Sequence, residues 1–350
     1  MIPDVPLAEP GAVPLLRAID LRVEVPVDGV LRPAVDGVSL DIERGECLAV
    51  VGESGSGKTM LGRALLDLLP EGARRTGSVR FDGQDLGAMT EKRWSAIRGR
   101  RIALVFQEPG AALDPVRTIG AQIDEALRRH GPPGTAERRR RATKLLEEVA
   151  FPDPEHGLSE YAHRLSGGQR QRAFLAIALA GNPSLLIADE PTASLDATVA
   201  AEVLDLLDRL RRQRGLALLL ITHDLAAAAL RADRVLVLYA GKVAEEGAAR
   251  TVLSLPRHPY TRALLACVPR LSDASLPRRR LPAIPGSVPD LAFRPRGVCA
   301  FVSRCPDRFA PCDRGEPLLY PTGSSLARCF LFDPASNPSG PTFRGPGPAA

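Results

Sequence analysis

The chain has 350 residues, of which 45% are hydrophobic and 4% aromatic, and its formal net charge at pH 7 is +5. That apolar content excludes a globally disordered protein, and the core must depend on aliphatic side chains. Apolar runs such as 216–221 are far shorter than the ~18–20 residues of a membrane-spanning helix, and residues 1–14 lack the basic region of a signal peptide. We therefore expect a protein of the cytosol or of the cytosolic face of a membrane.

Strands predominate at the start of the chain, after a lead at 1–14 that we expect to be disordered. Apolar and polar residues alternate in 21–25 and again in 38–42. The unbroken apolar run 47–51 predicts a buried parallel strand. A glycine-rich loop follows that strand, and a helix is expected over 59–69.

From residue 78 onward, strand-like and helical segments alternate. Helical spacing is present in 137–149, and buried strands are expected at 184–188 and 216–221. The remaining expected elements are a strand at 78–82, helices at 169–180 and 199–213, and an antiparallel pair at 234–239 and 242–244. Alternation of this kind predicts an α/β fold with a largely parallel sheet.

Residues 52–59 match the pattern G-x-x-x-x-G-K-[ST] of a phosphate-binding loop, between a strand and a helix as that loop requires. Its glycines let backbone N–H groups point at phosphate oxygens, and the helix start adds a positive dipole end. Lys58 is expected to bridge the β- and γ-phosphates of ATP, and the hydroxyl of Thr59 to bind Mg²⁺. The expected nucleotide contacts in this loop are Gly52, Ser54, Gly55, Ser56, Gly57, Lys58 and Thr59. Kinases, helicases, GTPases and transporters all use such a loop, so it does not decide the function.

A second, acidic motif ends a buried strand. Four apolar residues, 185–188, precede Asp189 and Glu190, and a parallel strand delivers such acids to the sheet edge where ligands bind. Asp189 is expected to hold Mg²⁺, and Glu190 to orient and deprotonate the attacking water. The alternative is a strand that ends in ordinary solvated acids, which the upstream phosphate loop disfavours.

The segment 165–172 reads Leu-Ser-Gly-Gly-Gln-Arg-Gln-Arg and strongly resembles the signature of the ATP-binding cassette family. Physically it is a second phosphate cradle, since Ser166 and the amides of Gly167 and Gly168 stand at the start of a helix. The resemblance implies that these residues and Gln169 close on the γ-phosphate of ATP bound by an opposite subunit. Two subunits are therefore expected to pair head to tail.

The resemblance covers about residues 15–250, and three more positions match motifs of the family. It implies that Gln107 contacts Mg²⁺ and senses a membrane partner, that Asp196 lies at the seam between subunits, and that His223 contacts the γ-phosphate. The implied catalytic residues are Glu190, His223, Gln107 and Lys58. The implied fold is a RecA-like core with an antiparallel β subdomain and a helical subdomain inserted at about 89–165.

One departure from the family concerns the adenine base. Family members usually stack an aromatic side chain on the base, from the segment before the phosphate loop, but residues 20–36 contain none. Val25 is the side chain expected there instead. Selectivity for ATP is therefore less secure than ATP hydrolysis.

Several short segments look like the peptide/nickel branch of importers in this family. They are 106–109, 113–120, 257–265, 284–291 and 299–306. The last three lie in an extension, 251–332. A Pro, Gly and Ser-rich tail, 333–350, follows it, and we expect that tail to be disordered. The resemblance implies an ATPase on the cytoplasmic face of the cell membrane that energises uptake of di- or oligopeptides or a related solute. Its implied partners are two membrane-embedded permease subunits, an extracytoplasmic solute-binding protein, and a second ATP-binding subunit, with a related chain favoured over an identical one.

Four of the six cysteines gather in the extension: Cys299, Cys305, Cys312 and Cys329. Thiolates at this spacing can bind a [4Fe–4S] cluster or Zn²⁺, whereas the alternative is four free thiols in a poorly packed segment. Some members of the resembled branch carry an iron–sulfur cluster there, which favours the cluster. The other two, Cys47 in a strand and Cys267 in a helix, are expected to be ordinary core residues.

Two other functions are compatible with parts of the sequence. A soluble cassette ATPase that acts on nucleic acid or the ribosome would fit the positive charge. Such relatives usually carry tandem cassettes or a long coiled-coil insertion, and this sequence has neither. A non-hydrolysing regulatory subunit is disfavoured because Lys58, Glu190 and His223 are intact. We expect no nucleic-acid partner.

Overall fold

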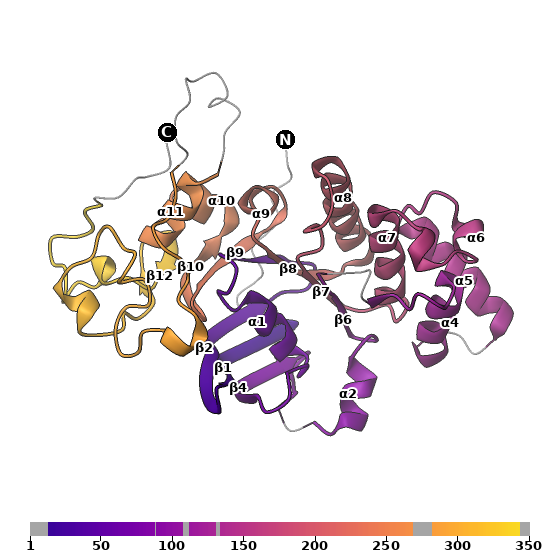
Figure 1. The fold of residues 1–350 in the computed structure, drawn as a ribbon, viewed down its shortest axis with the longest axis horizontal. Coiled ribbons are helices and arrows are strands. Elements are labelled where there is room, and N and C mark those ends of the chain that lie inside the picture. The colour runs from indigo at the N-terminus through magenta and orange to yellow at the C-terminus, as the bar shows by residue number, and fades with distance from the viewer. Residues whose placement is uncertain (1–12, 88, 108–111, 131–133, 269–281, 344–350) are drawn as a thin grey trace, which may run out of the picture. The chain divides into compact units, whose positions relative to one another are not determined.

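The computed structural model describes residues 13–343 except 88, 108–111, 131–133 and 269–281 (Figure 1). The chain forms two compact units, and each is built from segments that are interleaved in the sequence. The first unit consists of residues 1–20, 39–46 and 77–219, and the second of 21–38, 47–76 and 220–350.

A short parallel sheet and a group of helices make up most of the first unit. Strands β6 (Ile102–Val105) and β7 (Leu185–Asp189) pair in parallel, and β7 is entirely buried, in keeping with its unbroken apolar run. Helices α4, α5 and α7 pack against one another. The helices that the structure describes in this unit are α2 (Glu91–Ile97), α4 (Ile119–His130), α5 (Thr135–Glu148), α6 (Pro154–Gly157), α7 (Gly167–Ala178) and α8 (Ala197–Arg214), with a 3₁₀ turn, η1, at Ala162–Arg164.

A four-stranded sheet of order β2-β1-β4-β5 contributes residues to both units. Its strands are β1 (Leu16–Val27), β2 (Val30–Ile42), β4 (Arg74–Phe81) and β5 (Gln84–Asp85). The two residues between β1 and β2 leave room only for a tight hairpin, so these strands are antiparallel. In the first unit, Arg17 of β1 forms an ion pair with Asp41 of β2 at 2.8 Å.

The second unit is built on a sheet of order β11-β12-β10-β9-β3. β3 is parallel to β9, β9 is antiparallel to β10, and β12 is antiparallel to both β10 and β11. The end of the chain thus extends the sheet that carries β3. The strands are β3 (Cys47–Val51), β9 (Arg234–Tyr239), β10 (Lys242–Ala248), β11 (Tyr320–Pro321) and β12 (Ser325–Ala327), while β8 (Ala217–Thr222) has residues in both units. Among the described residues of this unit, the helices are α1 (Lys58–Leu65), α9 (Leu225–Arg231), α10 (Ala249–Ser254) and α11 (Pro259–Ala266), with 3₁₀ turns η3 (Leu291–Phe293), η4 (Ala310–Asp313) and η5 (Phe330–Phe332).

Three buried aromatic rings join the C-terminal segment, which is the extension at 251–332, to the sheet of the second unit. Tyr239 of β9 lies 4.6 Å from Tyr260 of α11 and 5.1 Å from Phe301, measured between ring centroids. Their hydrophobic cluster also contains Cys299 and Cys312. The extension therefore shares a core with the sheet, and the alternative of a poorly packed segment does not hold.

The predicted α/β class and the buried strands are confirmed, but three details differ. The helix expected over 59–69 ends at Leu65, because Asp67 adopts a left-handed conformation with φ of 56°. The region 89–165 contains strand β6 as well as helices, since a four-residue apolar run is too short to reveal a period. Cys267 follows the end of α11 rather than lying inside that helix.

The ends of the chain are described only in part. Most of the lead at 1–14 and the last residues of the tail lie outside the described residues. Residues 333–343 contain turns, in which the side chain of Asn337 donates a hydrogen bond to the carbonyl of Leu331 at 3.0 Å. In the part of the chain that the structure describes, no helix has the length and apolar character to cross a membrane.

Candidate nucleotide-binding site

The phosphate-binding loop, residues 52–59, connects β3 to α1 in the second unit. All three glycines of the loop have positive φ, with values of 153° at Gly52, 77° at Gly55 and 106° at Gly57, and the first and third lie against other strands. A Cβ atom would lie 2.2 Å from the carbonyl oxygen of Leu238 at the first position and 2.5 Å from that of Ala34 at the third. Only glycine fits at either place, and the sequence pattern of the loop follows from this close approach.

Lys58 is the first residue of α1, and its side chain is buried. Its ammonium group donates hydrogen bonds to the carbonyl oxygens of Gly52, at 2.8 Å, and Glu53, at 3.0 Å, so it lies within the curl of the loop. Thr59 follows in the first turn of the same helix, where backbone N–H groups have no intrahelical acceptor. A cation, a hydroxyl and helix N-terminal amides are thus brought together, which suits the phosphates of a nucleotide.

In the first unit, two predicted site segments leave the same edge of the parallel sheet. Val105 of β6 lies opposite Ala188 of β7, so Gln107 and the pair Asp189–Glu190 follow their strands at one edge. Both acids are buried, at 4% and 8% exposure, whereas Gln107 is exposed. The φ of Glu190 is 49°, a left-handed conformation that is uncommon for a residue other than glycine and often marks a functional site.

The signature segment begins helix α7 of the first unit with a capping box. The hydroxyl of Ser166 accepts the N–H of Gln169 at 3.3 Å, and the side-chain oxygen of Gln169 accepts the N–H of Ser166 at 2.9 Å. Gly167 is exposed at this helix start, where N–H groups can bind an anion. Further along α7, Phe174 stacks on Phe106, with ring centroids 6.1 Å apart, and so joins the signature helix to the segment of Gln107.

The starts of α7 and α8 pack together in the same unit. A Cβ atom on Gly168 would lie 2.7 Å from the side chain of Val199. Asp196 caps α8 by accepting the N–H groups of Thr198 and Val199 at 3.1 and 3.0 Å. The structure therefore places the predicted signature and the predicted seam residue side by side.

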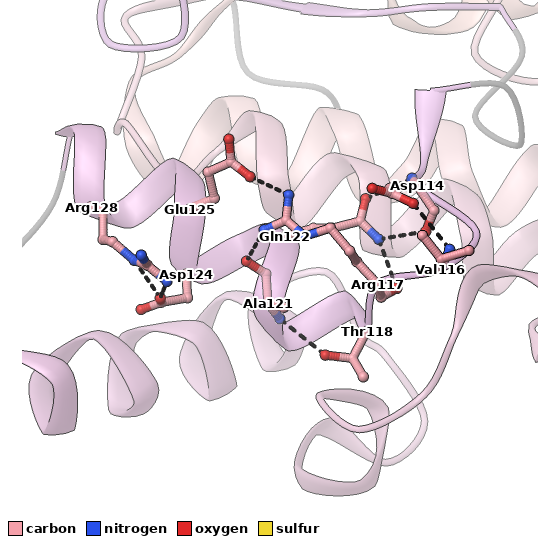
Figure 2. A network of polar contacts seen from close by, with 9 residues as sticks. All are labelled: Asp114, Val116, Arg117, Thr118, Ala121, Gln122, Asp124, Glu125 and Arg128. Atoms are coloured by element: carbon pink, nitrogen blue, oxygen red, sulfur yellow. Dashed lines mark hydrogen bonds and ion pairs between the residues drawn. The ribbon is translucent and has the colours of Figure 1, made fainter.

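The described segment before α4, residues 112–118, is braced by Gln122 (Figure 2). The side-chain oxygen of Gln122 accepts the N–H of Asp114 at 2.9 Å, and its amide group donates to the carbonyls of Asp114 and Arg117 at 3.0 and 3.1 Å. The carboxylate of Asp114 also accepts the N–H of Val116, whose side chain is 80% exposed. This network fixes a loop that presents an exposed apolar residue.

His223 belongs to the second unit, as does the phosphate loop. It is exposed and lies between β8 and Asp224, which caps α9 by accepting two backbone N–H groups. Val25, also in this unit, is only 8% exposed because it lies on the buried face of β1. It therefore offers little surface to an adenine ring.

Comparisons with known proteins decide the family. A profile described as ABC transporter matches residues 35–193, and one described as the C-terminal region of oligopeptide/dipeptide transporters matches 244–312. A peptide import ATP-binding protein of Brucella melitensis is 45% identical over 317 residues, which are 90% of this chain and 94% of that protein. The chain belongs to the ABC transporter family of ATP-binding proteins.

Further relatives and solved structures of the same family are similar to this ABC protein. The dipeptide transport ATP-binding protein of Bacillus subtilis is 41% identical over 322 residues, covering 91% of this chain and 95% of that one. Among solved structures, a dimeric ATP-binding cassette in a post-hydrolysis state with ADP and phosphate superposes with a TM-score of 0.60 at 28% identity, covering 67% of this chain and 99% of that chain. A cassette from Clostridium perfringens superposes with a TM-score of 0.59 at 27% identity, covering 69% of this chain and 91% of that chain. The predicted cassette fold is confirmed.

Two arginines of the ABC protein that no sequence motif indicates contact its phosphate loop. Arg304 binds the carboxylate of Glu53 with two N–O distances of 2.9 Å, and Arg294 donates to the carbonyl of Gly55 at 2.8 Å. Burial acts to lower the pKa of Arg304, but hydrogen bonds to Glu53 and Tyr239 outweigh it and raise that pKa. No spacing rule connects positions 251 residues apart, so the sequence carries no signal for this contact.

The four cysteines of the extension all lie in the second unit and influence one another electrostatically. A hydrogen bond between Cys299 and Cys312 raises the pKa of Cys299 and lowers that of Cys312 to about 6. Burial raises the pKa values of Cys305 and Cys329 to about 12. Within the described ranges, no group of three or more His, Cys, Asp or Glu side chains is arranged to hold a metal ion. The four cysteines therefore offer the thiol ligands that the sequence predicted, but the described residues do not hold them in the arrangement of a bound metal ion.

Proposed function

We propose that this ABC protein binds and hydrolyses ATP with Mg²⁺ to drive import of peptides or a related solute through partner permeases. The observation that carries the proposal is the match to peptide-import and dipeptide-transport ATP-binding proteins over about nine-tenths of the chain. That match includes the C-terminal region of oligopeptide/dipeptide transporters. The phosphate loop supports it, since its amides and buried Lys58 offer donors for phosphate oxygens.

The residues that act on ATP are part of this proposal. Lys58 turns from two neutral carbonyl oxygens to the charged β- and γ-phosphates, which form stronger charge-assisted hydrogen bonds. Thr59 and Asp189 supply oxygen ligands for Mg²⁺, the ligand type that this hard cation prefers. Glu190 accepts the proton of the attacking water as general base.

The remaining site residues complete the γ-phosphate environment. Gln107 contacts Mg²⁺, and His223 contacts the γ-phosphate. Ser166 and the amides of Gly167 and Gly168 receive the γ-phosphate held by a second subunit, with Asp196 at the seam. The capped start of α7 supports this role, and a related solved cassette with ADP and phosphate is dimeric.

The assembly follows from the same proposal. Two membrane-embedded permease subunits form the path, and the ABC protein docks on them at the cytoplasmic face of the cell membrane. A second ATP-binding subunit, related rather than identical, completes the pair, and an extracytoplasmic solute-binding protein delivers the cargo. The alternative of an ATPase acting on nucleic acid or the ribosome is not favoured, because the relatives are named for peptide transport.

We further propose that Cys299, Cys305, Cys312 and Cys329 hold a [4Fe–4S] cluster. Four cysteine thiolates are the usual ligand set of such a cluster, and three of these side chains are buried. Zn²⁺, bound by the same four sulfurs at about 2.3 Å, is the alternative occupant. When bound, the cluster would fasten the loops between these cysteines.

Nucleotide binding and phosphate release by the full-length chain test the ATPase part of the proposal. We expect Lys58→Met to abolish binding of a fluorescent ATP analogue with Mg²⁺. Lys144→Met, which changes an exposed lysine on α5, is the matched control and is expected to bind as the wild type does. Unchanged binding by the Lys58→Met variant would contradict the proposed site.

A further inference from the structure

Every polar group of Glu53, the second residue of the phosphate loop, is engaged, and two of its partners come from far along the chain. Its carboxylate forms a bidentate ion pair with Arg304, at 2.9 Å for each hydrogen bond. Its N–H donates to the hydroxyl of Tyr260 at 2.9 Å, and its carbonyl accepts from Lys58. All four residues belong to the second unit. The C-terminal segment therefore fixes both the side chain and the backbone of this loop residue.

The Glu53–Arg304 pair differs from an ordinary surface ion pair. The Arg304 side chain is only 5% exposed, against 27% for Glu53. The Arg304 guanidinium also donates to the carbonyls of Pro285, at 2.7 Å, and Gly286, at 3.3 Å. A planar guanidinium with this many fixed acceptors holds one orientation, and it imposes that orientation on the bidentate carboxylate. Exposed pairs contribute little, but loss of one partner from a buried pair leaves an uncompensated charge.

A second arginine of the same C-terminal segment contacts the other half of the loop. Arg294 donates to the carbonyl of Gly55 at 2.8 Å. Its guanidinium also donates to the carbonyls of Pro33 and Ala34 at 2.8 and 3.0 Å. The Ala34 carbonyl lies against Gly57 of the loop. Arg294 therefore links β2 to the loop at a point where the two backbones are close together. The two arginines together hold the loop at Glu53 and at Gly55.

We infer that Arg304 and Arg294 are positioning residues of the phosphate loop, through which the C-terminal segment sets the affinity for ATP. The inference rests on the proposed ATP binding and adds residues outside the motifs that carry it. A phosphate cradle depends on the directions of its N–H groups, so a loop fixed in advance does not lose conformational freedom when ATP binds. By linkage, ATP must in turn stabilise the segment around Arg304.

The test compares ATP affinity among variants of the full-length chain, with the same fluorescent ATP analogue and Mg²⁺. Arg304→Ala and Glu53→Gln are each expected to weaken binding by about tenfold, the size of one buried charged hydrogen bond. The double variant is expected to bind ATP no more weakly than the weaker-binding of the two single variants, because both substitutions remove the same ion pair. Arg304→Lys keeps the charge without the fork and is expected to recover binding in part. Arg308→Ala, which breaks an exposed pair with Asp313 in the same segment, is the control and is expected to stay within about twofold.

Two further readouts separate positioning from a merely structural role. The KM for ATP is expected to rise in Glu53→Gln while kcat at saturating ATP is kept, since the missing contact acts on binding. Hydrogen exchange of the amides at 299–305 is expected to slow when ATP binds the wild type, and not when it binds Glu53→Gln. If Arg304→Ala does not fold, Glu53→Gln still decides, because it leaves the buried arginine in place.

If Arg304→Ala and Glu53→Gln bind ATP as the wild type does, while Lys58→Met has lost binding, the positioning role is overturned and the ATP site stands. If the effects of the two single variants add in the double variant, the ion pair is not the cause. If the wild type binds no ATP, the proposed function fails and the inference fails with it.

Discussion

Gly52 of the phosphate loop lies against Leu238 of β9 so closely that a Cβ atom there would come within 2.2 Å of the Leu238 carbonyl oxygen. A backbone oxygen in a paired strand cannot turn aside as the end of a flexible side chain can. The first residue of the loop is therefore fixed by the strand beside it, and the curl of the loop starts from a defined position.

Gly52→Ala is expected to abolish ATP binding and to lower the free energy of unfolding by about 2–4 kcal/mol, because the added methyl group forces the loop from β9. Gly29→Ala is the matched control, since Gly29 has φ of 75° but no atom within 4 Å of its Cβ position. It carries only left-handed strain of about 1–2 kcal/mol and is expected to keep ATP binding. Denaturant unfolding and analogue binding measure both variants. Normal binding by Gly52→Ala would show that the loop is not held as described.

Glu190→Gln is expected to bind ATP normally and to lower kcat by about 10²–10⁴-fold, because an amide cannot accept the proton of the attacking water. Glu202→Gln is the control within the same unit. Glu202 lies on α8, where its exposed carboxylate pairs with Arg172 at 2.8 Å. Phosphate release at saturating ATP makes the comparison. A kcat for Glu190→Gln close to that of the wild type would remove this residue from the base role.

Anaerobic purification is expected to yield a protein with about four irons per chain and a broad absorbance shoulder near ~400 nm. Cys312→Ser is expected to lose the shoulder, because a serine oxygen is a poor ligand for this iron. Cys267→Ser, outside the four-cysteine set, is expected to keep it. A colourless wild type, with zinc or without metal, would contradict the cluster.

Acid is expected to destabilise the second unit through His258. Burial lowers the pKa of His258 from its ordinary value of 6.5 to about 3. Between these values the unfolded chain binds a proton that the folded chain does not. The contribution of His258 to the free energy of unfolding is therefore complete above pH 6.5, and it falls by about 1.4 kcal/mol for each unit by which the pH is lowered below that. Denaturant unfolding between pH 7 and pH 5 measures the slope.

His258→Asn isolates this effect from other titrating groups. Asparagine can still cap α11, as the His258 ring does by accepting the N–H of Tyr260 at 3.0 Å, but it does not titrate. The comparison is needed because burial raises the pKa of neighbouring Glu245, which gives a slope of the opposite sign. Equal pH slopes for the two chains would mean that His258 is not the source.

The local parts of the site could be predicted from the sequence because neighbouring residues determine them. Gly52 and Gly57 report a close backbone approach, and the spacing of Ser166 and Gln169 is that of a capping box. Asp189 follows an apolar run whose length and burial define a strand. The roles of these residues in catalysis stay predictions.

The remaining parts depend on contacts between distant residues. Strand β6 cannot be predicted from the sequence because four apolar residues define no period. The rings of Tyr239, Tyr260 and Phe301, separated in the chain, give the extension a core that no local apolar pattern reveals. The pairing of Glu53 with Arg304 depends on the packing of that core, so it could be found only in three dimensions.

Uptake of labelled di- and tripeptides by cells that lack this chain tests the central claim most directly. Cells complemented with the wild-type chain are expected to regain energy-dependent uptake, and cells complemented with Glu190→Gln are expected to remain without it. Uptake that does not depend on the chain, or that Glu190→Gln restores fully, would contradict an ATPase that drives peptide import.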